Sequence, residues 1–320
     1  MLPEERPIFI VGVHRSGTSL LRYMLNSSPR IYIAPESDFI PRFFLGKPQQ
    51  ELDDEAIDSL LQTIFSEYNN YRSEWQGELP EASAFVEAMP DRTPTSFLAT
   101  LYGTYAEQHQ AERWGDKTPI YASYMDLIDR LFPNAQFIHI IRDGRDAALS
   151  MLDKWADREF HVDPFFAARN WVRRIRRAQA SGARLGPDRY CEVRYEALVA
   201  DPDGELAKLC QFLDEPYRPQ MARPQVLGRQ TIEPGSWNEP IRHPPSTARI
   251  GRWRKDLSVA DQRLTQRIEG KLLLELGYQL EELGPMPWTE RLRLAALALK
   301  YVSLQAGRRV LQEVGLFPPI

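Results

Sequence analysis

The stretch "PIFIVGVHRSGTSLLRYML", residues 7–25, combines patterns that together favour one kind of fold. Its first six residues are an apolar run ending in Gly12, which is typical of a buried parallel strand. Apolar residues then recur at helical spacing from Leu20 to Leu25. A strand, a tight turn and a helix start direct several backbone N–H groups and the helix dipole at one point. This arrangement predicts an anion-binding site.

The turn has the outline of a nucleotide-binding P-loop without its lysine. Gly12 and Gly17 have the G-x-x-x-x-G spacing, Ser19 stands where a P-loop Ser/Thr would ligate magnesium, and Thr18 occupies the lysine position. Arg15 supplies basic charge instead, and its planar guanidinium matches phosphate or sulfate oxygens. The loop therefore belongs either to a decayed ATP-using enzyme or to a protein with a different anionic ligand.

A second apolar strand bears on that choice. Residues 135–146, "AQFIHIIRDGRD", run from a strand into a charged turn, and "AALSMLDKW" continues as a helix. A P-loop kinase would normally use a carboxylate here to hold magnesium, whereas Arg142 follows the strand. An arginine suits an anionic ligand better than a metal, so a P-loop nucleotide kinase using ATP is the minor alternative.

Strands and helices alternate along most of the chain. Short strands are also predicted at 31–34 and within 188–199, which favours an α/β, P-loop-type three-layer fold with a central parallel sheet. Residues 45–112 are helical and acidic, and we interpret them as a helical cap insertion on the acceptor side of one domain, 1–285. Residues 286–320 form a basic, leucine-rich helical tail that is too polar to span a bilayer. The tail is expected to pack on the domain or in a homodimer, with peripheral membrane contact as an alternative.

The composition limits the classes of partner and compartment. The 320 residues carry a net charge of −4, so no global basic field indicates nucleic acid. Cys191 and Cys210 have no metal-ligand spacing, which favours a reducing compartment. The N-terminal residues lack the basic and apolar regions of a signal peptide. We therefore expect a cytoplasmic protein.

Several motifs resemble those of one enzyme family. "FIVGVHRSGTSLLRYML" (9–25) and "FIHIIRDGRDAALSML" (137–152) are similar to the two cofactor-binding signatures of sulfotransferases that use 3′-phosphoadenosine 5′-phosphosulfate (PAPS). The R-S-G-T loop is the form seen in tyrosylprotein and carbohydrate sulfotransferases. The layout of 115–151, "RYEALVADP" (194–202) and "GRWRKDLS" (251–258) resembles the tyrosylprotein branch most.

The resemblance implies that the sulfuryl group of PAPS passes in line to an acceptor hydroxyl and leaves 3′-phosphoadenosine 5′-phosphate (PAP), with no required metal. The loop is then expected to hold the 5′-phosphosulfate through Arg15, Ser16, Gly17, Thr18 and Ser19. 

The other family contacts fall on separate motifs. Arg142 and Ser150 have the spacing of the 3′-phosphate contacts, and Tyr195 and Arg252 match further nucleotide-binding positions. Lys117, in "GDKTP", would reach the bridging oxygen or the sulfuryl group, although a surface ion pair with the adjacent aspartate is its alternative.

The resemblance also indicates the base. Glu36, in "APESDF", lies where the tyrosylprotein branch has its catalytic glutamate, so Glu36 is the expected base, with Lys117 and Arg15 as electrostatic catalysts. Many cytosolic sulfotransferases use a histidine instead, so a histidine base stays open. The candidates are His14, His109, His139, His161 and His243, of which His139 is expected in the core.

The acceptor has no motif of its own: a glycan, lipid, small-molecule or tyrosine hydroxyl all fit. Four arginines in "NWVRRIRRAQ" (170–179) are expected on a solvated helix face, or else as a positive rim that recruits an anionic acceptor. A non-catalytic nucleotide-binding protein is the remaining alternative to an enzyme.

Overall fold

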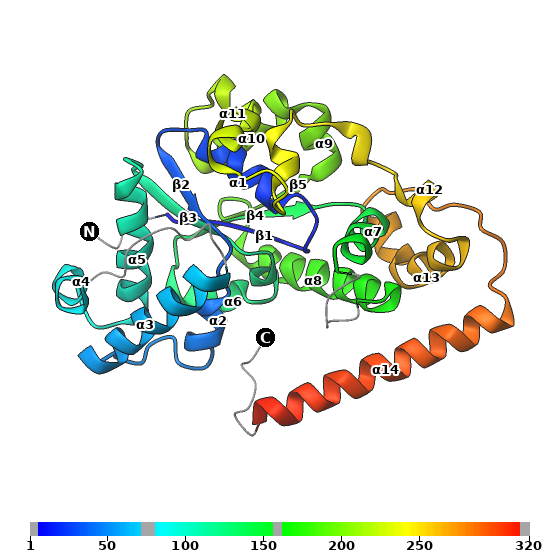
Figure 1. The fold of residues 1–320 in the computed structure, drawn as a ribbon, viewed down its shortest axis with the longest axis horizontal. Coiled ribbons are helices and arrows are strands. Elements are labelled where there is room, and N and C mark those ends of the chain that lie inside the picture. The colour runs from blue at the N-terminus through cyan, green and yellow to red at the C-terminus, as the bar shows by residue number, and fades with distance from the viewer. Residues whose placement is uncertain (1–5, 72–80, 156–161, 314–320) are drawn as a thin grey trace.

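A five-stranded parallel sheet forms the centre of the computed structural model, which describes residues 6–71, 81–155 and 162–313 (Figure 1). The strand order is β2-β3-β1-β4-β5, and every pair is parallel. The bounds are β1 Ile8–Gly12, β2 Ile31–Ala34, β3 Arg113–Lys117, β4 Gln136–Ile141 and β5 Tyr190–Arg194. This sheet confirms the α/β prediction. It also contains β3, which was not among the strands predicted from the sequence.

Helices cover both faces of the sheet and make three layers. Alternate residues of β1 point to opposite faces: Ile8 and Ile10 pack under α1, α9 and α10, while Phe9 and Val11 pack against α5 and α6. The helices that Figure 1 shows above the sheet are α1 Thr18–Asn26, α9 Tyr195–Ala200, α10 Pro202–Leu213 and α11 Pro224–Thr231. Those on the other side include α5 Pro94–Gln108, α6 Met125–Leu131 and α8 Pro164–Leu185.

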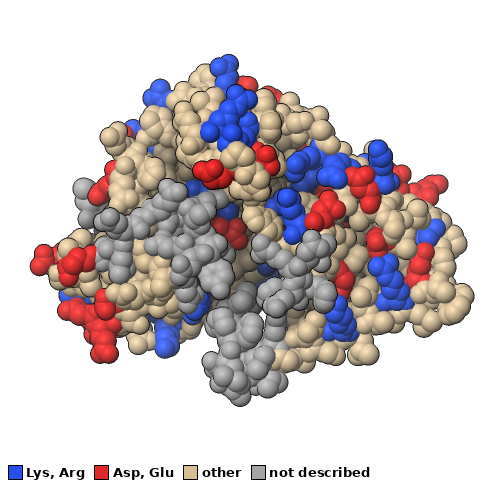
Figure 2. Space-filling view, viewed as in Figure 1, with Lys and Arg blue, Asp and Glu red and all other residues tan. Residues whose placement is uncertain are grey.

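The segment interpreted as an insertion contains three helices with different roles. They are α3 Asp54–Tyr71, α4 Ala82–Ala88 and α5, preceded by α2 Phe39–Phe44. Helix α5 packs directly on β2 and β3, so the end of the 45–112 segment belongs to the three-layer core. In Figure 2 acidic side chains gather at the left edge, over α3 and α4, and charges of both signs mix elsewhere on that face.

The C-terminal half adds helices beside the β4 end of the sheet. Here α7 Gly144–Trp155, α8 and α13 Val259–Glu275 share an apolar cluster that includes Trp171 and Ile141. The remaining elements are α12 Trp253–Asp256 and the short 3-10 turns Pro119–Ser123, Pro219–Ala222, Glu239–Arg242 and Thr247–Arg249.

The tail is one long helix, α14 Trp288–Glu313. It contacts α8 through the ring of Tyr301, which lies against Phe165 and Phe166, and through an ion pair between Lys300 and Asp163. Within residues 6–71, 81–155 and 162–313, no helix is long and apolar enough to cross a membrane.

Candidate active site

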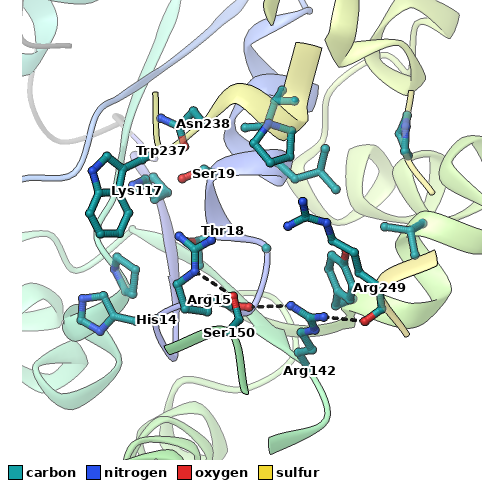
Figure 3. A pocket seen from close by; sticks show the side chains of 18 of the residues that line it. His14, Arg15, Thr18, Ser19, Lys117, Arg142, Ser150, Trp237, Asn238 and Arg249 are labelled. Carbon is teal, nitrogen blue, oxygen red and sulfur yellow. Dashed lines mark hydrogen bonds between the residues drawn. The ribbon is translucent and has the colours of Figure 1, made fainter. Parts of the chain in front are cut away.

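A cavity of about 680 Å³ opens at the carboxyl edge of the sheet (Figure 3). Its floor is the loop between β1 and α1, and its walls come from the ends of β3 and β4 and from residues 236–249. Most of the sequence-predicted site residues line it: Arg15, Gly17, Thr18, Ser19, Glu36, Lys117, Arg142, Ser150 and Tyr195.

The loop owes its shape to two positive backbone angles. Gly17 has φ 96° and Arg15 has φ 68°, and the Ser16 amide donates to the Val13 carbonyl at 3.2 Å. A Cβ on Gly17 would lie 2.5 Å from Cδ2 of Tyr195, so only glycine fits at this position. Helix α1 starts at the next residue, and its first turn therefore faces the cavity.

Ser16 differs from its neighbours in the loop. Its side chain is fully buried and it does not line the cavity. Its hydroxyl has no hydrogen-bond partner in the part of the chain that the structure describes. The structure therefore does not bring this predicted contact to the cavity surface.

Arginine side chains from separate elements converge above the loop. Arg15 Nε donates to Ser150 Oγ at 3.1 Å. Arg142 Nη1 donates to the Arg15 carbonyl at 3.0 Å, and its Nη2 donates to the Arg249 carbonyl at 2.7 Å (Figure 3). The Arg142 guanidinium also lies 4.5 Å from the centre of the Tyr195 ring. Residues that are more than 100 positions apart in sequence thus form one cluster, and Arg142 and Ser150, which have the spacing of 3′-phosphate contacts, both belong to it.

The cluster carries excess positive charge. Burial lowers the pKa of the Arg15 guanidinium, and the nearby charges of Arg249 and Arg142 lower it further. Glu36 is the neighbouring group that acts in the opposite direction on this pKa. Cations held together at a cost to their own charged state make a site that an anion would stabilise.

Glu36 lies between two basic side chains. Lys117 Nζ, 4% exposed at the end of β3, donates to Glu36 Oε2 at 3.0 Å. His14 Nε2 lies 3.5 Å from Oε1 of the same carboxylate. Lys117 thus pairs with Glu36 inside the cavity, and the alternative of a surface ion pair with Asp116 is wrong.

A buried polar network holds the Glu36 loop against β3. Ser37 Oγ donates to Asp116 Oδ2 at 2.9 Å and lies 2.7 Å from the Tyr121 hydroxyl. The Ser37 amide donates to Thr118 Oγ1, and the Tyr102 hydroxyl donates to Asp116 Oδ2, both at 2.8 Å. Burial raises the pKa of Asp116 to about 6. The network fixes the residue after Glu36 to the residues on either side of Lys117.

One arginine that we expected in solvent is buried beside the site, where it contacts the cavity-lining His14. Arg174 of α8 is buried, and its Nη1 donates to His14 Nδ1 at 2.6 Å. Arg173, Arg176 and Arg177 are exposed, as expected for a solvated face. The signal was present in the sequence: Arg174 follows Trp171 by three residues and precedes Ala178 by four, so it shares their buried stripe.

The cofactor-binding prediction for Arg252 is not matched by its position. Its Nε and Nη2 donate to Asp256 Oδ2 at 2.9 and 2.7 Å, and it does not line the cavity. Arg249, three residues earlier, lines the cavity instead, together with Trp237, whose ring centre is 5.9 Å from the Arg15 guanidinium carbon. Neither Arg249 nor Trp237 was singled out from the sequence.

The other histidines differ in burial and in whether they line the cavity. His139 is fully buried in β4, where burial lowers its pKa to about 3, so it is a core residue as expected. His109 stacks on Tyr32 outside the cavity, and His243 lines the cavity. His161 lies outside the described residues.

Comparison with known proteins places this geometry in a family. The chain is 26% identical over 225 residues to protein-tyrosine sulfotransferase A of Caenorhabditis elegans, covering 69% of this chain and 53% of that protein. It is 28% identical over 212 residues to the protein-tyrosine sulfotransferase of Drosophila melanogaster, covering 66% and 38%. The chain thus spans about half of the first relative and less than half of the second.

A solved structure agrees with the sequence matches. The sulfotransferase domain of the Synechococcus PCC 7002 olefin synthase superposes with a TM-score of 0.59 at 25% identity, covering 88% of this chain and 99% of that one. The model of the sulfotransferase family matches residues 7–219. These matches confirm the resemblance and favour a sulfotransferase over an ATP-using kinase. Since the matched residues make up more than half of the chain, the protein belongs to the sulfotransferase family.

Proposed function

We propose that this protein transfers the sulfuryl group of PAPS to an acceptor hydroxyl, with Glu36 as the base. The observation that carries the proposal is one cavity in which an anion-binding cluster and a carboxylate–lysine pair lie side by side. The cluster has the chemistry that a polyanionic nucleotide requires, and the pair has the chemistry that a hydroxyl nucleophile requires.

The residues divide between the two ends of the nucleotide. Gly17, Thr18 and Ser19, at the start of α1, offer backbone N–H groups and hydroxyls to the 5′-phosphosulfate. Arg142 and Ser150 are assigned to the 3′-phosphate. Arg15 touches Ser150 and faces Glu36, so it can serve either end. Arg249 replaces Arg252 in the assignment because its position borders the same cavity.

PAPS, when bound, supplies an electrophilic sulfuryl group and a phosphate leaving group. Glu36 would take the proton of the acceptor hydroxyl as the hydroxyl oxygen bonds to sulfur and the bond between sulfur and the 5′-phosphate oxygen breaks. Lys117 orients the Glu36 carboxylate and, with Arg15, sets positive charge beside the oxygens on which negative charge develops. The products are a sulfate ester and PAP, and the hydroxyl proton ends on Glu36.

Hydrogen bonding supports Glu36 over the neighbouring histidine as the base. An arginine can only donate, so His14 Nδ1 accepts from Arg174 with its lone pair. Neutral His14 then carries its proton on Nε2, which faces Glu36. Neither ring nitrogen of His14 is left with a lone pair for the proton of an acceptor.

The acceptor proposed for first study is a tyrosine hydroxyl, as in the names of the curated relatives. The exposed Arg173 and Arg177 act on Tyr124 beside the buried Arg174 and make this part of the surface positive, which favours an acceptor that carries negative charge near its hydroxyl. Glycan, lipid and small-molecule hydroxyls belong in the same assay panel.

The proposal extends to the compartment and the tail. Cys191 and Cys210 are free thiols, which suits the reducing cytoplasm. Trp288, Leu292 and Leu299 are exposed on α14, which supports a second copy or a membrane surface as the tail's partner. Cell fractionation tests the compartment. Sedimentation with and without lipid vesicles tests the two partners.

Sulfate transfer from ³⁵S-labelled PAPS tests the enzyme assignment directly. Glu36→Gln should lower kcat by about 10²- to 10⁴-fold, the usual contribution of a general base. PAP should bind this variant as tightly as wild type or more tightly, because a negative charge beside the anion site is removed. Glu107→Gln, an exposed position on α5, is the matched control. PAP binding without turnover on any acceptor would favour a non-catalytic protein, and loss of activity in EDTA would contradict the metal-free mechanism.

A further inference from the structure

Arg174 is a buried cation with an unusual partner. It comes from the middle of α8 and is flanked in its stripe by Trp171, Ile175 and Ala178, all fully buried. Among the described residues it forms no ion pair with a carboxylate, and its hydrogen bond goes to the neutral acceptor His14 Nδ1. Burial lowers the pKa of Arg174 to about 10. Burying a charged guanidinium without a carboxylate partner is unfavourable, so we expect Arg174 to have a role in the neighbouring site.

The groups that face His14 determine its protonation state. Arg174 approaches from α8, Glu36 from the loop after β2, Lys117 from β3, and the Trp155 ring from α7 at 5.5 Å between centres. Burial lowers the pKa of His14 most, followed by the charge of Arg174, whereas Glu36 acts in the opposite direction. The balance favours the neutral imidazole.

The groups that face Arg174 itself complete the electrostatic environment. Arg173 lowers its pKa, whereas Glu36, Tyr124 and Tyr301 raise it. Because a pKa of about 10 is still well above neutral pH, Arg174 stays charged and its hydrogen bond to His14 persists across the working range.

We propose that Arg174 is a positioning residue that acts through His14. By occupying Nδ1 it locks the imidazole neutral with its proton on Nε2, directed at Glu36. The Glu36 carboxylate is thereby oriented from both sides, by Lys117 at Oε2 and by His14 at Oε1, and keeps its negative charge available to the acceptor proton. This inference rests on Glu36 being the base.

Removing the guanidinium should turn His14 into a competing titratable group. Without the charge of Arg174, the pKa of His14 would rise toward its ordinary value of about 6.5, with burial still holding it lower, and the imidazole could then protonate. The resulting imidazolium would form an ion pair with Glu36, lower the pKa of that carboxyl and weaken it as a base. Activity would then fall on mild acidification for a reason that is absent from the wild type.

The kinetic test compares kcat against pH for wild type, Arg174→Gln, Arg174→Lys and the double variant His14→Gln/Arg174→Gln. For Arg174→Gln we expect kcat to fall from pH 8 to pH 6 beyond the fall in wild type, by up to about fourfold, which is the limit for a group that titrates at 6.5. Arg174→Lys, which can still donate to Nδ1, and the double variant, which has no imidazole, should lose this extra fall. Arg169→Gln, an exposed position on α8, is the matched control. An equal loss of kcat at every pH in Arg174→Gln would overturn the proposal.

A second measurement does not depend on activity. In ¹⁵N-histidine NMR of the full chain, wild-type His14 should show the Nε2–H tautomer and no titration between pH 5.5 and 8, whereas His14 of Arg174→Gln should begin to titrate within this range. A wild-type His14 that titrates near 6.5 would overturn the lock even if no Arg174 variant folds. A locked His14 in a protein whose Glu36→Gln variant keeps full activity would instead contradict the proposed base.

Discussion

Arg249 offers a direct test of how the cavity holds a nucleotide. Its carbonyl accepts from Arg142, and its side chain is exposed and close enough to Arg15 to lower the pKa of that guanidinium. Arg249→Gln keeps the carbonyl, and with it the position of Arg142, but removes one positive charge from the cavity. The substitution should therefore weaken nucleotide binding, whereas it should leave the nucleotide-free protein as stable as before or more stable.

The magnitude follows from the interaction that is lost. A hydrogen bond to a charged group contributes about 1.5–3 kcal/mol, so PAP should bind Arg249→Gln about 10- to 150-fold more weakly. The nucleotide-free protein should lose nothing, because the substitution relieves repulsion between Arg249 and Arg15. Its Tm should be unchanged or slightly higher.

Titration calorimetry with PAP and a thermal melt without it provide the assay. Arg252→Gln is the control, since Arg252 is only three residues away but binds Asp256 outside the cavity. Its PAP affinity should match that of wild type. If Arg252→Gln weakened PAP binding while Arg249→Gln did not, the family-based assignment would be right and the geometric one refuted.

Two further substitutions probe the loop and the network behind the site. Gly17→Ala should lower the free energy of unfolding by about 1–2 kcal/mol because of the φ of 96°, and further because the new Cβ displaces Tyr195. It should also weaken PAP binding. Urea unfolding checks the loss of stability, with Gly103→Ala as the comparison, where an added Cβ meets nothing within 4 Å. Asp116→Asn tests how stability depends on pH. The folded protein keeps a proton on Asp116 up to about pH 6, whereas the unfolded chain releases it near pH 4. The wild-type fold therefore loses stability as pH rises and this carboxyl becomes charged. The stability of Asp116→Asn relative to wild type should thus increase by up to about 3 kcal/mol between pH 4 and pH 7, and parallel stability curves would contradict the shift.

Local sequence patterns were sufficient to predict the part of the site formed by the loop after β1 and the turn after β4. Strand, turn and helix follow one another within residues 7–25 and again within 135–151, so neighbouring residues determine each element. Both strands end at the same edge of a parallel sheet, which brings the residues after them together: Arg15 reaches Ser150, and Arg142 reaches the Arg15 carbonyl.

Strand β3 and two of the cavity-lining side chains could not be predicted from local sequence, because tertiary packing determines them. Strand β3 reads "RWGDK", which lacks an apolar run, yet its residues from Trp114 to Lys117 are buried because polar partners compensate them. Lys117 therefore came from resemblance alone. Arg249 and Trp237 lie on a proline-rich connection without periodicity, so nothing local indicates which of its side chains turn inward.

The "RDGRD" motif explains why Arg249 rather than Arg252 reaches the cavity. Asp146, two residues into α7, accepts from the backbone amides of Gly251 and Trp253 at 2.7 and 3.0 Å and so fixes the turn between the two arginines. Trp253 is then fully buried beneath the Arg145 guanidinium, 3.8 Å from its ring centre, and α12 begins there. With this tryptophan anchored, the residue before it turns toward α12 and the solvent, while the residues before Gly251 lie along the cavity. The second half of the signature thus acts through the backbone of a distant segment, and the basic-Trp element positions a cavity-lining arginine, the proposed nucleotide contact, that lies outside the element itself.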